Sequence, residues 1–466
     1  MKKRMSRLIK YLALSLMLFV FLSQSSCSND NDFEEQEQGQ QEPGQEEVSD
    51  EAVPFIEITT QGPIVDDPKV KASIKISEKG NVVHEGHIGI ELRGASSLHF
   101  DKKSYGVETW DANGEDIDVS LLGMPAEEDW VLHGPYSDKS LMRNKLMYDI
   151  SNDMGRYASR TQFVELKINA FFKGVYVFME KLKRDKERID IKKLNIDENS
   201  GEDLTGGYIL KIDKTAGSNL GDGYNHQNSF RSEHKPKFSE ANINFLYEYP
   251  DAEDITSQQK EYISSYVKGF ENALASDNFK DPEVGYRAFI DVPSFVDFFI
   301  LNELSNNVDG YRISTYMHKD KNGKLKMGPI WDFNLGFGNA DYCSGESTEV
   351  WAYKFNERCP GDYWSVPFWW YRLLEDPYFV EELKQRWNVL RGNVLSVESI
   401  KGKTAAYETK LNESDAIHTN FTIWNILGEY VWPNNFVGTS HTAERIYLEE
   451  WVSERVAWLD VHISQL

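Results

Sequence analysis

Gly-Pro-Ile-Trp-Asp-Phe-Asn-Leu-Gly-Phe-Gly, residues 328–338, and Asn-Asn-Val-Asp-Gly-Tyr-Arg-Ile-Ser-Thr-Tyr, residues 306–316, are the stretches that decide the fold. Each sets one aspartate at the end of an apolar run, beside residues that favour turns: Asp309 in the earlier stretch and Asp332 in the later one. Asp309 follows a predicted helix, and Asp332 follows a predicted strand. The spacing of 23 residues from 309 to 332 leaves room for a hairpin that turns at Asn322-Gly323.

Two aspartates in these settings suit phosphoryl transfer. One carboxylate can orient an attacking hydroxyl while the other holds a magnesium ion. Asn334, two residues after Asp332, adds an amide oxygen that such an ion accepts. Each aspartate also has an ordinary alternative role: Asp309 as an Asx-turn before Gly310, and Asp332 as a helix cap.

The first 27 residues have the pattern of an export signal. The first ten carry five basic residues and no acidic one, residues 11–22 are mostly apolar, and Ser23-Gln24-Ser25-Ser26 precedes Cys27. The apolar run is shorter than the roughly 20 residues that a membrane span needs. A cysteine directly after small residues resembles a bacterial lipobox, so we expect residues 1–26 to be removed and Cys27 to carry a lipid. An ordinary signal peptide with an incidental cysteine is the alternative.

Residues 28–52 hold ten acidic residues and no basic one, which predicts an extended, disordered tether. The acidic start after Cys27 resembles the export signals of surface lipoproteins in Bacteroidetes-type bacteria, so we expect an outer-membrane protein that faces outward. The net charge is −24, and removal of the five basic residues in 1–26 makes it more negative. Nucleic acid is therefore excluded as a partner, because its binding depends on neutralising phosphates with Lys and Arg.

Only Cys343 and Cys359 remain after Cys27. In an exported protein they could form a disulfide, and two free buried thiols are the alternative. The sequence has no Cys/His cluster with the spacing of a structural zinc site.

Residues 53–466 have no Pro/Gly/Ser-rich break and an α+β pattern. Alternating segments over 54–110 and a hairpin over 164–179, turning at Lys173-Gly174, predict a strand-rich N-terminal lobe of about 53–215. A helix-rich C-terminal lobe of about 216–466 follows. Its expected helices span residues 257–274, 292–304, 379–390 and 443–463.

The chain resembles the CotH family of atypical secreted protein kinases over roughly residues 54–465. The resemblance rests on segments that occur in order: Arg93–Ser97, Lys102–Tyr105, Asp129–Leu132, Tyr136–Asn144, Gly174–Glu180, Gly206–Tyr208 and the two aspartate stretches. It implies a bilobal, protein-kinase-like fold.

The resemblance also implies roles at the two aspartates and around the nucleotide. Asp309 would be the catalytic aspartate, and Asp332 with Asn334 would hold Mg²⁺ or Mn²⁺. Lys103 would reach the phosphates of ATP, with Lys102 as the second choice.

Three further positions receive expectations from the same resemblance. Arg93 would contact phosphate or pair with a carboxylate, and Glu180 would lie where a hinge meets the nucleotide base. Arg143-Asn144 would hold a loop or a carboxylate.

Two features depart from ordinary protein kinases. Ser314 stands five residues after Asp309, where those enzymes carry an asparagine for a second metal ion, and no GxGxxG loop is present. The expected activity is transfer of the γ-phosphate of ATP to Ser or Thr of an exported protein by a lipid-anchored kinase. The alternatives are a catalytically silent binding protein with the same fold, or a glycan-active enzyme with paired carboxylates.

Overall fold

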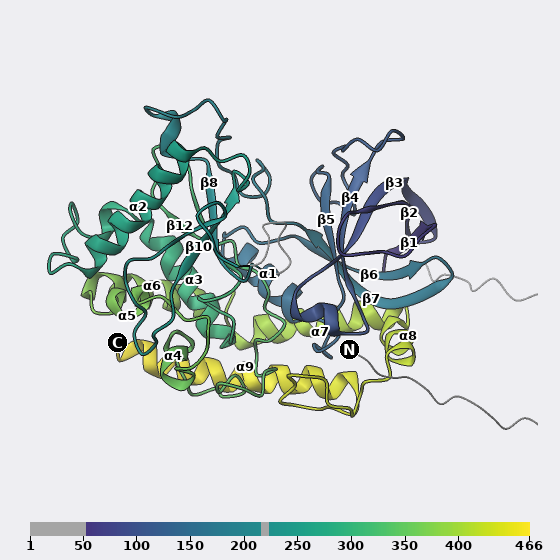
Figure 1. Ribbon diagram of the computed structural model, residues 1–466. Coiled ribbons are helices and arrows are strands. Elements are labelled where there is room, and N and C mark those ends of the chain that lie inside the picture. The colour runs from purple at the N-terminus through teal and green to yellow at the C-terminus, as the bar shows by residue number, and fades with distance from the viewer. Residues whose placement is uncertain (1–52, 216–222) are drawn as a thin grey trace, which may run out of the picture. The chain divides into compact units, whose positions relative to one another are not determined.

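Strands come first along the chain and helices dominate later, as the sequence predicts (Figure 1). The computed structural model describes residues 53–215 and 223–466. The predicted signal peptide, Cys27 and the acidic tether lie outside the described residues, so those expectations stay predictions.

The first seven strands close into a barrel. Their order is β1-β2-β3-β4-β5-β7-β6, and β6 returns to pair with β1 in parallel. Alternate isoleucines such as Ile56, Ile58 and Ile74 are almost completely buried, because successive side chains of a strand point to opposite faces and one face lines the barrel core. The bounds are β1 Phe55–Thr60, β2 Val70–Glu78, β3 Asn81–Arg93, β4 Ser104–Trp110, β5 Asp129–His133, β6 Thr161–Ile168 and β7 Phe171–Glu180.

The β6–β7 hairpin turns at a different place from the predicted one. β6 ends at Ile168 and β7 begins at Phe171, and Asn169 between them has a left-handed φ of 53°. The expected turn at Lys173-Gly174 is therefore wrong. Gly174 instead lies within β7, where a Cβ would come 2.5 Å from the side-chain oxygen of Asn420. A glycine is needed there because a distant segment packs closely against the strand.

A second sheet has five strands in the order β12-β11-β8-β10-β9. The predicted hairpin around Asn322-Gly323 is confirmed, since β11 pairs with β12. β8 pairs with β11 and β10, so this strand belongs to the second sheet although it precedes the boundary expected near residue 215, which stays a prediction. The bounds are β8 Tyr208–Ile212, β9 Ser229–Arg231, β10 Asn244–Tyr249, β11 Thr315–Lys319 and β12 Lys326–Met327.

The predicted long helices are confirmed. Helix α3 is buried at nearly every position and forms the centre of the larger hydrophobic core. Its start follows from Asp291, which caps the Ser294 amide, and from Pro293 in the first turn. The α-helices are α1 Arg143–Asp153, α2 Ser257–Ala275, α3 Val292–Ser305, α4 Phe355–Arg358, α5 Trp369–Leu373, α6 Pro377–Arg391, α7 Val397–Glu413, α8 Ala416–Ile423 and α9 His441–Ser464. Short 3₁₀ turns cover Ser96–His99, Asp203–Thr205, Tyr286–Ala288 and Ala352–Lys354.

Helix α8 packs against the barrel although it comes late in the sequence. The side-chain oxygen of Asn420 accepts hydrogen bonds from the Val175 amide at 3.1 Å and from Lys102 at 2.7 Å. Strands thus dominate the first part of the described chain and helices the later part, and α8 from the later part contacts the barrel. Among residues 53–215 and 223–466, no helix combines the length and apolarity that a bilayer crossing requires.

Candidate active site

Asp309 lies in the turn that joins α3 to β11. Asn306 ends α3 in a left-handed conformation, with φ of 42°. The carbonyl of Asp309 then accepts hydrogen bonds from the amides of Arg312 at 3.4 Å and Ile313 at 3.0 Å. The Asp309 side chain is 15% exposed. The turn therefore holds a carboxylate that solvent or a substrate can still reach.

Asp332 follows β12 and has a left-handed backbone, with φ of 64°. Such a conformation is uncommon outside glycine and is disfavoured for most side chains. Three side chains hold it in place. The Asp332 amide donates to the Tyr148 hydroxyl at 3.1 Å, its carbonyl accepts from Asn307 at 3.2 Å, and the Phe333 amide donates to Asn144 at 2.6 Å. These contacts offset the local strain.

Helix α1 supplies the support for the segment after Asp332. The Arg143 guanidinium donates to Asp138 at 2.5 Å and to the carbonyl of Gly336 at 3.1 Å. Asn144 bonds the Phe333 amide, and Tyr148 bonds Asp332 itself. Arg143 thus holds a carboxylate, one of the two expected roles, and together with Asn144 it holds the segment after Asp332; the expected contact with the phosphate-side loop stays a prediction.

The carboxylate of Asp332 is not paired with any cation among the described residues. Burial, with Asp309 and Asp213 as further causes, raises its pKa from 3.8 to about 7, while Lys214 and Arg93 act in the opposite direction. Its oxygens have no hydrogen-bond partner in the described part of the chain and remain accessible to solvent. Like-charged carboxylates with too little neutralising charge are a setting that a bound cation relieves.

Asp213 and Lys214 are site residues that the sequence analysis missed. They follow β8, whose Ile212 pairs with Thr315 just beyond the Asp309 turn. The Asp213 carboxylate accepts the Lys214 amide at 2.8 Å, and burial raises its pKa. The available signal was an Asp-Lys pair at the end of a short apolar strand, which says nothing of the neighbouring strand.

The donor set around Asp332 fits a hard divalent cation. The Asn334 side chain is half-buried and makes no hydrogen bond within the described residues, so its amide oxygen, two residues after Asp332 in sequence, is available as a ligand. Carboxylate and amide oxygens are the ligands that Mg²⁺ accepts.

A cluster of three acidic side chains on the barrel is a weaker candidate for a metal site, because a lysine already neutralises it. Asp118, Glu127 and Glu128 are the one described group of three whose ligand atoms lie within 4.8 Å of one another. Lys183 is 2.6 Å from both glutamates and supplies their positive charge. Asp332 and Asn334 therefore remain the candidate metal ligands.

The two lysines expected at the phosphates are bound by other groups of the protein. Lys103 donates to the carbonyls of Leu98 at 2.7 Å and Phe100 at 2.5 Å, which closes the connection between β3 and β4. Lys102 is buried against Asn420, and burial places its pKa well below the usual value. The structure therefore gives both lysines structural contacts.

Arg93 and Lys214 are the cations that act on Asp332. Arg93 ends β3, and its guanidinium lies 5.5 Å from the centre of the Trp331 ring, next to Asp332 in sequence. Lys214 lies 5.2 Å from the centre of the Trp364 ring. Of the two roles expected for Arg93, a place at the phosphates is compatible with this position.

Glu180 has a structural role in the barrel. Its buried carboxylate accepts hydrogen bonds from the Tyr157 hydroxyl at 3.1 Å, the Arg160 amide at 3.0 Å and the Arg160 guanidinium at 2.7 Å. These partners bind both oxygens of the carboxylate, and the expected place of Glu180 at a hinge to the nucleotide base stays a prediction. The sequence placed Glu180 correctly at the end of a strand but could not show Arg160 beside it.

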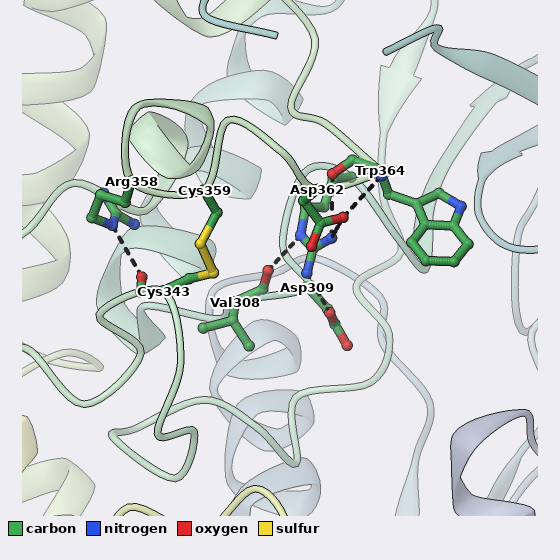
Figure 2. The surroundings of a disulfide bond; sticks show 8 residues. Val308, Asp309, Cys343, Arg358, Cys359, Asp362 and Trp364 are labelled. Atoms are coloured by element: carbon green, nitrogen blue, oxygen red, sulfur yellow. Dashed lines mark hydrogen bonds and ion pairs between the residues drawn. A yellow bond between two sulfur atoms is a disulfide. The ribbon is translucent and has the colours of Figure 1, made fainter. Parts of the chain in front are cut away.

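Cys343 and Cys359 form a disulfide, with their Cα atoms 5.9 Å apart. The bond lies close to the Asp309 turn, as Figure 2 shows. Arg312, which the sequence analysis did not single out, is buried and donates to Asp309 at 3.0 Å. The site thus consists of two supported aspartates, nearby cations and a cross-linked loop.

Three known proteins or families are similar to this chain, to different extents. The family model described as CotH kinase protein matches residues 90–459. Inner spore coat protein H of Bacillus subtilis (strain 168) is 31% identical over 117 residues, which cover 25% of this chain and only 28% of that protein. The proinflammatory kinase CtkA of Helicobacter pylori matches 77% of this chain and 94% of its own, with 10% identity and a TM-score of 0.30. Because the family model spans most of the sequence, the chain belongs to the CotH kinase family.

Proposed function

We propose that this protein is an extracytoplasmic kinase that transfers the γ-phosphate of ATP to a Ser or Thr hydroxyl of an exported protein. The observation that carries the proposal is the pair formed by Asp309 and Asp332, whose backbones share the side chain of Asn307. Family membership implies a kinase-like activity. The choice of a protein hydroxyl as acceptor is part of the proposal.

Each site residue has a chemical part in this reaction. Asp309 orients the acceptor hydroxyl and takes its proton as the oxygen–phosphorus bond forms and the bond to the leaving ADP breaks. Asp332 and Asn334 would hold Mg²⁺ or Mn²⁺, which neutralises charge on the phosphate oxygens. Arg93 and Lys214, which act on Asp332, would add positive charge near the phosphates. Lys103 would join them only by leaving its two carbonyl partners.

The location outside the cytoplasm is proposed from the N-terminal sequence alone. A lipid on Cys27 would anchor the chain in the outer membrane, and residues 28–52 would separate the kinase from the lipid surface. Incorporation of a labelled fatty acid in cells, lost in Cys27→Ala, tests the anchor. Digestion by protease added to intact cells tests whether the protein faces outward.

A silent binding protein is the second candidate. Ser314 replaces the asparagine of ordinary kinases, and its amide contacts Asp213. The glycan-active alternative is weaker, because the adjacent Trp369 and Trp370, which could otherwise stack on a sugar, are buried in the core. Incubation with polysaccharides and assay of released sugar tests that alternative directly.

The deciding experiment compares the parent protein with Asp332→Ala and Asp309→Ala. Thermal unfolding is followed with ATP and either Mg²⁺ or Mn²⁺, and transfer is followed with labelled ATP. Ligand at 100 times its dissociation constant stabilises a fold by about 2.7 kcal/mol. We expect the metal-dependent shift to vanish in Asp332→Ala and to persist in Asp309→Ala, which loses transfer. No shift in the parent would favour the silent binding protein.

A further inference from the structure

Arg312 fixes the direction of the Asp309 side chain. Its Nη2 donates to Asp309 Oδ1 at 3.0 Å, and its Nε donates to the carbonyl of Val308 at 2.7 Å. Asp309 Oδ2 makes no hydrogen bond within the described residues. A charge-assisted bond on one oxygen therefore leaves the other free for an acceptor hydroxyl.

The far edge of the same guanidinium is bound by a different segment. Nη1 of Arg312 donates to Asp362 at 3.1 Å and to the carbonyl of Trp364 at 3.3 Å, and the guanidinium lies 4.0 Å from the centre of the Phe355 ring. Arg312 is only 2% exposed and spans the space between the two segments. Its position is therefore set by residues 355–364 as much as by its own turn.

The disulfide anchors residues 355–364 through Cys359. Cys359 follows α4, and its carbonyl accepts the Asp362 amide at 3.1 Å (Figure 2). Across the bond, the Cys343 carbonyl accepts from Arg358 at 3.1 Å. The cross-link thus holds the turn that carries Asp362.

The loop between the two cysteines also grips the start of the Asp309 turn. The side-chain amide of Asn306 donates to the carbonyls of Ser344 at 2.9 Å, Gly345 at 3.3 Å and Ser347 at 3.0 Å. Asn306 ends α3 three residues before Asp309, and Arg312 lies three residues after it. The disulfide-closed loop therefore contacts the turn on both sides of the catalytic carboxylate.

We propose that Arg312 is a positioning residue for Asp309 and that the disulfide-closed loop, residues 343–359, sets its place through Phe355 and Asn306, and through the Cys359 carbonyl, which holds Asp362. This rests on the proposed kinase function. The contacts that hold Asp332 come from Tyr148, Asn144 and Asn307, outside that loop. Tyr148 and Asn144 still hold Asp332 without the cross-link, so its loss lowers phosphate transfer more than binding of the metal and nucleotide.

The kinetic test compares the exported chain, purified without reductant, with Cys343→Ser/Cys359→Ser, Arg312→Lys and Arg312→Met. We expect kcat to fall at least tenfold in the cysteine variant and further in Arg312→Met, while the dissociation constant for Mg²⁺–ATP stays within threefold of the parent. Arg312→Lys, which keeps the charge, should recover part of kcat. Arg391→Lys, at a surface pair with Asp460, is the matched control and should behave like the parent. An unchanged kcat in the cysteine variant would overturn the proposal.

A second test does not depend on activity. Hydrogen exchange is measured over residues 306–314, where the Arg312 and Ile313 amides bond the Asp309 carbonyl. We expect exchange there to become at least tenfold faster in the cysteine variant, with the barrel strands β1–β7 unchanged. If the parent transfers no phosphate, the kinase proposal fails but this measurement still decides the link. Equal exchange over 306–314 in both proteins would disprove it.

Discussion

Asn307 donates a hydrogen bond from its side-chain nitrogen to the carbonyl oxygen of Asp332, over 3.2 Å. Its side-chain oxygen accepts the Asp309 amide at 3.2 Å. One buried side chain therefore fixes the two candidate aspartates relative to each other, although 23 residues separate them in sequence. The hairpin of β11 and β12 between them brings the two stretches back together.

Replacement of Asn307 by alanine should remove the link that fixes Asp309 and Asp332 relative to each other. Both hydrogen bonds are lost, and each contributes about 1 kcal/mol to stability, with more lost where a group stays buried and unpaired. We expect weaker Mg²⁺–ATP binding and slower transfer, beyond the effect of reduced stability. Asn420→Ala is the control, because Asn420 is equally buried but bonds Val175 and Lys102 on the barrel. Equal loss of nucleotide binding in both variants would contradict the assignment.

Asp332 should make the metal-free protein less stable as pH rises. Its folded pKa of about 7 lies above the ordinary 3.8, so the folded state binds the proton more tightly than the unfolded state. Stability therefore falls as pH increases from about 4 to about 7. With EDTA present, Asp332→Asn should raise the melting temperature most at pH 8, by less at pH 5, and hardly at all below pH 4.

Added Mg²⁺ supplies the check on this interpretation. The ion replaces the proton, so it should stabilise the parent at pH 8 more than at pH 5 and leave Asp332→Asn almost unaffected. If Asp332→Asn does not raise the melting temperature at pH 8 in EDTA, ionisation of Asp332 carries no cost in stability.

The elements with strong local patterns could be predicted from the sequence. The periodic helices α3, α6 and α9 and the hairpin at Asn322-Gly323 depend on neighbours within a few residues. The two aspartates could also be found, because each follows an apolar run and precedes turn residues.

The remaining parts depend on contacts between distant segments. The five-residue strand β8 could have joined either sheet, and its true place beside β11 is what brings Asp213 to the site. Gly174 suggested a turn, but it is required by Asn420 on α8. Arg312 gave no signal, because its partners Asp362 and Trp364 lie about fifty residues further along the chain. No local pattern contains such information.

Arg93 should matter more to nucleotide binding than Lys103. The charge of Arg93 acts on Asp332, whereas the Lys103 ammonium is held by two carbonyls of its own loop. We expect Arg93→Met to weaken Mg²⁺–ATP binding at least tenfold, which corresponds to about 1.4 kcal/mol. Lys103→Met should lower stability with a smaller change in affinity. Titration calorimetry on both variants decides, and a larger affinity loss in Lys103→Met would restore the role that the sequence suggested.

The buried pair of Glu303 and Arg455 should be the strongest single electrostatic contact outside the site. Both side chains are 0% exposed and lie 3.2 Å apart, between α3 and α9. Glu303 also accepts the amides of Ala352 and Tyr353, so it ties α3 to the segment before α4. Arg455→Met leaves a buried carboxylate without its cation, which costs about 3–5 kcal/mol.

The pH dependence of that loss identifies its cause. Burial raises the pKa of Glu303, and without Arg455 the folded state favours the protonated acid still more. Stability of the variant should therefore fall as pH rises, so its deficit relative to the parent is larger at pH 8 than at pH 5. Urea unfolding measures this, with Arg391→Met as a surface control that should cost at most about 1 kcal/mol. Adding Glu303→Gln to Arg455→Met should recover part of the loss, and a further loss instead would show that the carboxylate is stabilised by its amide donors alone.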